Sequence, residues 1–272
     1  MPTNAPRVEL PPLRPSYVLT RKGEGAGFSP GRAGMLYRDL IPDLQGGRFI
    51  ASHILVPEGG PVPDYVHFHR VRFQVIYCYK GWVRVVYEEQ GPPFVLQPGG
   101  CVLQPPRIRH RVLECARGLE VIEVACPAEY ETLADPELEL PTPALRPEQD
   151  SEGQRFSRHV ASQGSFGPWP IPGFESRDLG ISAATSGLAS AHVVRPRPAQ
   201  RGRTPEAPAL TAHDAELAFS FVLEGSASLD CEGHGQEAVT AGDAFVIPAG
   251  RKHALRDCSA DLELLEVVLP AA

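Results

Sequence analysis

The sequence lacks several features that would assign a function directly. It has no apolar run of about 18 residues or more, and its first 32 residues lack the apolar stretch of a secretory signal. Its 26 lysines and arginines against 33 acidic residues give a net charge of −7, which argues against a general nucleic-acid binder. Six cysteines include no Cys-x-x-Cys pair, and the sequence motifs of nucleotide-binding loops, hydrolase elbows and zinc proteases are missing. We therefore expect reduced thiols in a cytoplasmic protein without membrane or nucleic-acid partners.

What the sequence does contain indicates a β-rich fold. With 26 glycines and 29 prolines, about a fifth of the chain favours turns over long helices. Apolar residues recur in short, often alternating runs, a pattern typical of strands. These runs cover residues 48–56, 74–79, 82–87 and 119–124 in the first half and 217–223, 226–229, 243–247 and 262–268 in the second. The pattern predicts an all-β sandwich or barrel rather than alternating strands and helices.

The two halves of the chain repeat one pattern. Gly225 follows Gly81 by 144 residues, His213 follows His69 by 144, and His253 follows His110 by 143. A duplicated domain explains these equal offsets. We predict an N-terminal extension at residues 1–30, a first domain at 31–130, a linker at 131–160 and a second domain at 161–272. Residues 129–134 could form one short helix before Pro136.

Histidines of the first half have the spacing of a metal site. His67 and His69 are two residues apart, so on a strand both imidazoles point to one face. Gln74 follows after a turn, and His110 comes from a later strand. Three imidazoles and an amide oxygen suit Fe, Mn, Ni, Cu or Zn better than Ca or Mg. Gln74 could equally serve as a hydrogen-bond partner of an imidazole.

These residues carry a resemblance to the cupin family. The first cupin motif is matched by Gly60, His67, His69, Gln74 and Gly81, the second by Gly99, Pro105 and His110, and the second motif is matched again by residues 242–253. The resemblance implies two tandem jelly-roll β-barrels, each with a pocket inside. It also implies that the first domain is the metal-binding one.

Departures from the cupin pattern refine this expectation. Gln74 stands where cupins usually have a ligating glutamate, and the neutral amide should lower metal affinity and raise the electrophilicity of a bound ion. The resemblance implies that such a site can still work, because many cupin dioxygenases use three histidines and some cupin cyclases have a glutamine here. In the second half, Thr211 and Ala218 replace the first histidine and the glutamate. We expect a degenerate second barrel that supports the first by packing, with a residual ligand pocket as the alternative.

Two further residues are candidates for chemistry. Tyr65 precedes His67 by two residues and could act as an acid or orient a substrate, or could simply be an aromatic residue of the barrel lining. Arg109 lies next to His110 and could approach an anionic substrate or reach solvent. We take both as candidate catalytic residues.

The leading hypothesis is a metal-dependent dioxygenase that acts on a small aromatic or enolic organic acid. One divalent transition metal would be held by His67, His69, Gln74 and His110, with Fe(II) favoured and Zn, Ni or Mn as alternatives. A second hypothesis is a redox-neutral Zn or Ni isomerase, cyclase or lyase. A third is a non-catalytic protein that binds a small molecule. A small-molecule partner is expected in each case, and exposed faces could also build a homodimer.

Overall fold

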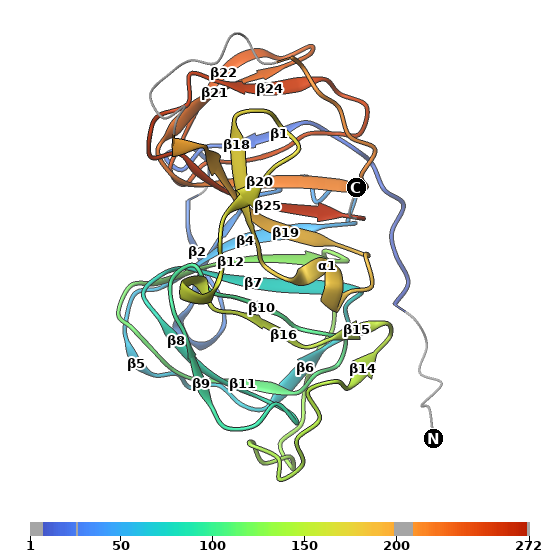
Figure 1. The fold of residues 1–272 in the computed structure, drawn as a ribbon. Coiled ribbons are helices and arrows are strands. Elements are labelled where there is room, and N and C mark those ends of the chain that lie inside the picture. Colours follow the sequence, from blue (N-terminus) through green and yellow to red (C-terminus); the bar gives the residue numbers. More distant parts are fainter. Residues whose placement is uncertain (1–7, 26, 199–208, 271–272) are drawn as a thin grey trace.

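The computed structural model describes residues 8–25, 27–198 and 209–270. These residues form two β-barrels stacked against each other (Figure 1). Their helical structure is limited to the short segments η1 (Arg32–Gly34), η2 (Ala161–Gln163) and α1 (Ile181–Ala184). The predicted all-β class with two tandem jelly-roll barrels is therefore confirmed. No helix among the described residues is long and apolar enough to cross a membrane.

The first barrel is made of two sheets with an apolar cluster between them. Its strands are β2 (Ser29–Pro30), β3 (Leu36–Asp39), β4 (Ile50–Val56), β5 (Gly60–Pro61), β6 (His67–His69), β7 (Phe73–Lys80), β8 (Val83–Tyr87), β9 (Phe94–Leu96), β10 (Cys101–Leu103), β11 (His110–Cys115), β12 (Leu119–Cys126), β13 (Thr132–Ala134) and β16 (Ser157–His159). The larger sheet has the order β16-β10-β7-β12-β4-β3-β2. The smaller has the order β13-β6-β11-β8-β9, with β5 beside β11.

The second barrel repeats this arrangement. Its strands are β1 (Val18–Thr20), β17 (Gly167–Pro168), β18 (Phe174–Asp178), β19 (Ser190–Pro196), β20 (Leu217–Glu224), β21 (Ser226–Cys231), β22 (Gly235–Thr240), β23 (Ala244–Val246), β24 (His253–Arg256) and β25 (Glu263–Leu269). One sheet has the order β1-β23-β20-β25-β19-β18-β17, and the other is β22-β21-β24. A small hairpin of β14 (Asp150–Ser151) and β15 (Gln154–Arg155) lies between the two halves of the chain.

Each barrel takes a strand from outside its own repeat. Strand β1, from the predicted N-terminal extension, pairs with β23 of the second barrel. Strand β16, from the predicted linker, pairs with β10 of the first barrel. Both strands lie at the end of a sheet, where they satisfy backbone groups that would otherwise be unpaired. The extension and the linker therefore take part in the fold.

The prediction of a short helix at residues 129–134 is wrong. Thr132–Ala134 instead forms β13, which pairs with His67–His69 of β6. The segment is too short for a helix to stabilise itself before Pro136, whereas the edge of β6 offers backbone hydrogen bonds at once. This difference matters for function, because it brings the segment against two of the candidate metal ligands.

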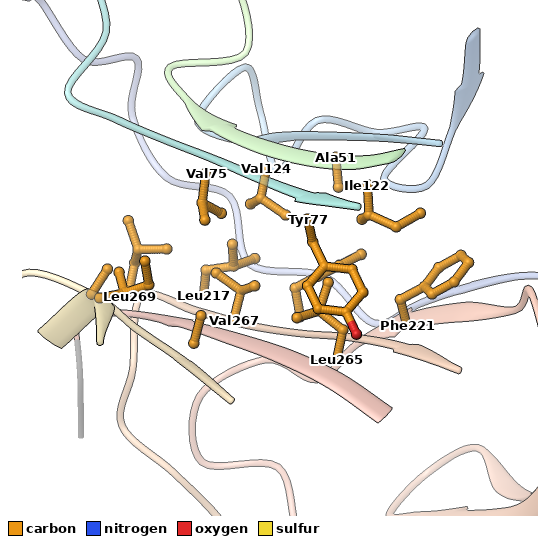
Figure 2. Packing of buried hydrophobic residues seen from close by; sticks show 14 of the residues in the cluster. Ala51, Val75, Tyr77, Ile122, Val124, Leu217, Phe221, Leu265, Val267 and Leu269 are labelled. Carbon is orange, nitrogen blue, oxygen red and sulfur yellow. The ribbon is translucent and has the colours of Figure 1, made fainter. Parts of the chain in front are cut away.

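The barrels share an apolar core where their larger sheets meet. In β7, Phe73, Val75 and Tyr77 belong to this shared cluster, whereas Ile76 packs in the cluster inside the first barrel. Figure 2 shows side chains of the two facing sheets, including Val75, Ile122 and Val124 from one and Leu217, Leu265 and Val267 from the other. Since both faces of these central strands are buried, they read as nearly continuous apolar runs. Phe73 and Val75 face the shared core. Because successive side chains of a strand point to opposite faces, Gln74 between them points into the first barrel.

The cysteines behave as expected for reduced thiols. All six are free, and five of them are buried. Burial raises the pKa of several of these thiols, that of Cys126 to about 11, so they remain protonated and unreactive.

Candidate metal centre

Three histidines converge inside the first barrel. His67 and His69 come from β6, and His110, the first residue of β11, lies directly opposite His67 in the strand pairing. Each offers one ring nitrogen to a group of atoms that lie within 4.8 Å of one another, and all three side chains are buried. Strand alternation places the first two on one face, and the pairing with β11 adds the third.

In each of the three rings, Nδ1 has a hydrogen-bond partner that fixes the orientation of the ring. His67 Nδ1 lies 2.8 Å from the carbonyl oxygen of Tyr65, and His110 Nδ1 lies 3.1 Å from that of Ile108. A carbonyl only accepts, so in both rings Nδ1 carries the hydrogen and the Nε2 lone pair is left for another partner. His69 Nδ1 lies 3.0 Å from the hydroxyl of Thr132. Such partners fix the tautomer and orientation of metal-binding imidazoles.

The three imidazoles are also held neutral. Burial lowers the pKa of His69 to about 3, and it lowers the pKa of His110 well below its ordinary value. The pKa of His67 is lowered by the same cause. Neutral rings present the lone pairs that a divalent metal needs.

Arg32 already contacts this group. Its Nη2 lies 2.8 Å from Nε2 of His67, and its Nη1 lies 3.7 Å from Oδ1 of Asp64. The guanidinium therefore donates to the lone pair that would hold a metal on His67. Arg32 and a metal compete for this nitrogen, so metal binding requires the guanidinium to move.

Gln74 leaves an acceptor without a partner. Its Oε1 is buried and accepts no hydrogen bond among the residues described, whereas its Nε2 donates to Oε1 of Glu123 at 2.7 Å. The hydroxyl of Tyr130 donates to the same carboxylate oxygen at 2.6 Å. Burial and the charge of Glu123 raise the pKa of Tyr130 well above its ordinary value, so it remains a donor. Three neutral imidazoles and an orphaned amide oxygen fit a divalent transition metal.

A cavity of about 100 Å³ opens beside these groups. Its polar lining includes His69, His110, Gln74, Glu123 and Arg32, and most of the remaining wall is aliphatic or aromatic. The cavity exceeds the room that one water needs, and its apolar wall suits an organic ligand.

The two predicted catalytic residues lie away from this cavity lining. Tyr65 is 50% exposed, and its ring packs edge-on against His67, while its backbone carbonyl orients that histidine. Arg109 pairs with Asp135 at 3.0 Å and with Glu88 at 3.6 Å. The structure thus brings His69, His110 and Gln74 to the cavity wall, with His67 in the same histidine group, and leaves Tyr65 and Arg109 outside the wall.

The residues that sequence reasoning missed contact the site from distant segments. Glu123 carried a signal, because it is a charge inside the apolar run at 119–124. Arg32 and Thr132 carried none, since Arg32 lies in the single turn η1 and Thr132 in the edge strand β13, neither of which a periodic pattern marks.

The described part of the second barrel holds no matching histidine group. Thr211 pairs with His253 as His67 pairs with His110, so the sequence replacement occurs at the equivalent place. His213 has both ring nitrogens occupied: Nε2 lies 3.0 Å from the carbonyl of Ile247, and Nδ1 accepts from the amide of residue 215. Among the described residues, the first-barrel histidines form the one group of this kind.

Comparisons with known proteins agree with this architecture. Residues 202–268 match the cupin domain family. A search of curated proteins finds no match to the sequence. Among solved structures, the protein Ylba from E. coli superposes with a TM-score of 0.65 at 11% identity, covering 97% of this chain and 94% of that one.

Two of the similar solved structures carry the names of enzymes. Oxalate decarboxylase from Lactobacillus farciminis, in a formate complex, has a TM-score of 0.64 at 13% identity and covers 98% of this chain and 88% of its own. Salicylate 1,2-dioxygenase from Pseudoaminobacter salicylatoxidans, in adducts with gentisate, has a TM-score of 0.64 at 14% identity and covers 95% and 82%. Identities this low show the shared fold alone.

Proposed function

We propose that this chain of two cupin barrels is a metal-dependent enzyme, namely a dioxygenase that acts on a small aromatic or enolic organic acid. The observation that carries the proposal is the convergence of three neutral imidazoles, each of which offers one ring nitrogen to a group of atoms within 4.8 Å of one another. His67, His69 and His110 would hold the metal, and the free Oε1 of Gln74 would complete or tune its shell. We favour Fe(II), with Zn, Ni or Mn as alternatives. The similarity to salicylate 1,2-dioxygenase supports the reaction class as an analogy of fold.

The protein's own groups would prepare the substrate. When bound, Fe(II) supplies a Lewis acid and a redox partner for O₂. The aliphatic wall of the cavity excludes water and packs against an organic ring. Tyr130 and Gln74 both donate to Glu123 and hold its carboxylate at the cavity wall.

We assign recognition of the substrate carboxylate to Arg32. Arg32 lines the cavity, its side chain is 38% exposed, and its one ion-pair partner among the residues that the structure describes is Asp64, at the loose distance of 3.7 Å. A guanidinium displaced from His67 by a metal can present its planar fork to a carboxylate. Arg109 is less suited, because two carboxylates already contact it. The roles predicted for Tyr65 and Arg109 remain predictions.

Oxygen uptake tests this function. Protein reconstituted with Fe(II) would be assayed with gentisate, catechol and a β-diketone, beside a His69→Ala variant. His213→Ala is the matched control, because this second-barrel histidine lies outside the site. We expect oxygen uptake with at least one of these compounds, abolished in His69→Ala and retained in His213→Ala. No uptake with any compound by metal-loaded protein would refute the dioxygenase.

A redox-neutral isomerase, cyclase or lyase is the second candidate. Glu123 favours it, because a carboxylate beside a metal-activated carbonyl could take a proton from the neighbouring carbon. Turnover by the Zn or Ni protein without O₂ would support this candidate. A Glu123→Gln variant would then lose activity while keeping its metal.

A further inference from the structure

The second barrel contains a cavity of its own. It measures about 50 Å³ and is walled largely by aromatic and aliphatic side chains, among them Trp169, Phe174 and Phe245. Its wall also carries one carboxylate, that of Glu266 on β25. This site lies in the half of the chain that has no histidine group among its described residues, so it is independent of the proposed metal centre.

Glu266 is the counterpart of Glu123 in the first barrel. It follows Glu123 by 143 residues, the same offset that separates His253 from His110. In the first barrel Gln74 donates to Glu123, but Ala218 stands in the position equivalent to Gln74 and offers no donor. The side-chain carboxylate of Glu266 accordingly has no hydrogen bond or ion pair with any residue that the structure describes.

The groups around Glu266 do not balance its charge. His192 and Ser220 flank it on the neighbouring strands, and His253 lines the cavity. Burial lowers the pKa of both His192 and His253, so neither imidazole is charged near neutral pH. His253 directs Nδ1 at a backbone carbonyl 3.1 Å away, which leaves its Nε2 as a further acceptor. An unpaired carboxylate in an apolar enclosure is costly unless a ligand pairs with it.

We propose that the second barrel binds a small organic cation, specifically a protonated primary amine with a short apolar chain. The ammonium group donates to the carboxylate of Glu266, taking the place that the Gln74 amide has in the first barrel. The apolar chain packs against Phe174 and Phe245, and aromatic faces add attraction for a cation. The volume of about 50 Å³ restricts the ligand to a few heavy atoms.

Calorimetric titration of the full-length protein with n-propylammonium chloride tests the proposal. Propionate and 1-propanol are control ligands, because they match the amine in size and differ from it in charge. We expect saturable binding of the amine, no binding of propionate, and affinity at least about tenfold weaker in Glu266→Gln. A His67→Ala, His69→Ala variant removes the first site and should bind the amine unchanged, which separates this proposal from the proposed function.

A second readout needs no substitution near the cavity. Burial raises the pKa of Glu266 to about 7, whereas the amine stays protonated throughout the range. Amine affinity of the wild-type protein should therefore fall as the pH is lowered from about 8 to about 5. No saturable binding at the higher pH, equal affinity in Glu266→Gln, or loss of binding in the histidine double variant would overturn the proposal.

Discussion

Replacing Glu216 by glutamine tests how the two barrels are held together. This residue precedes β20 of the second barrel, and its carboxylate accepts from two arginines of the first barrel. Arg48 Nε donates to Oε1 at 2.6 Å, and Arg72 Nη1 donates to Oε2 at 2.7 Å. The three side chains are only 13–24% exposed, so solvent screens these pairs weakly. Leu217, the chain neighbour of Glu216, belongs to the apolar core that the barrels share.

The expected loss follows from the number of charged hydrogen bonds removed. Glutamine keeps one acceptor oxygen and loses the other together with the negative charge, leaving two arginines near a neutral amide. A charge-assisted hydrogen bond contributes about 1.5–3 kcal/mol, so Glu216→Gln should lower the free energy of unfolding by about 2–3 kcal/mol. Urea denaturation at neutral pH measures this difference.

Acid should erase the difference between wild type and variant. Burial raises the pKa of Glu216, but hydrogen bonds and charges of Arg72 and Arg48 outweigh it and hold that pKa below its ordinary value. A lowered pKa means that the stabilisation is complete above the unfolded-state value and is lost as the pH falls through the folded-state value. The two proteins should therefore converge in acid.

A matched control comes from an exposed pair. Arg70 and Glu131 also meet at 2.7 Å, but their side chains are 48% and 61% exposed. Glu131→Gln should cost less than about 1 kcal/mol. Equal losses in the two variants, or a loss below about 0.5 kcal/mol for Glu216→Gln, would refute the reasoning.

Three further predictions concern the site and the core. Thr132→Val removes the partner of His69 Nδ1 and should weaken metal binding about tenfold in a competition titration, and unchanged affinity would contradict this. Arg32→Ala frees Nε2 of His67 and should strengthen metal binding in the same titration, so weaker binding would count against the competition. Phe219→Ala opens a cavity in the shared core, where Phe219 is fully buried, and should cost about 3–5 kcal/mol in urea denaturation; a loss below about 1 kcal/mol would argue against tight packing of the barrels.

The histidine group could be predicted because its information is local. Two histidines two residues apart share a strand face wherever the strand lies, and the offset to the second half marked the duplication. The inward orientation of Gln74 follows from the strand period once the shared core takes Phe73 and Val75. These features depend on short patterns, which a single sequence displays.

The remaining contacts depend on tertiary structure that no short pattern specifies. Arg32 reaches His67 from 35 residues away, and β1 joins a sheet whose partner strand is more than 200 residues distant. The side chain of Tyr65 also does not take the direction that strand alternation predicts, because β6 begins only at His67. Its side chain consequently points to the surface rather than into the cavity.

The metal content of the purified protein tests the central claim most directly. Protein prepared without chelators, and again after reconstitution with Fe(II), would be compared with the His67→Ala, His69→Ala double variant and with His213→Ala. The account predicts about one transition-metal ion per chain in wild type and His213→Ala, and none in the double variant. A wild-type protein that holds no metal after reconstitution, or a double variant that holds as much as wild type, would contradict it.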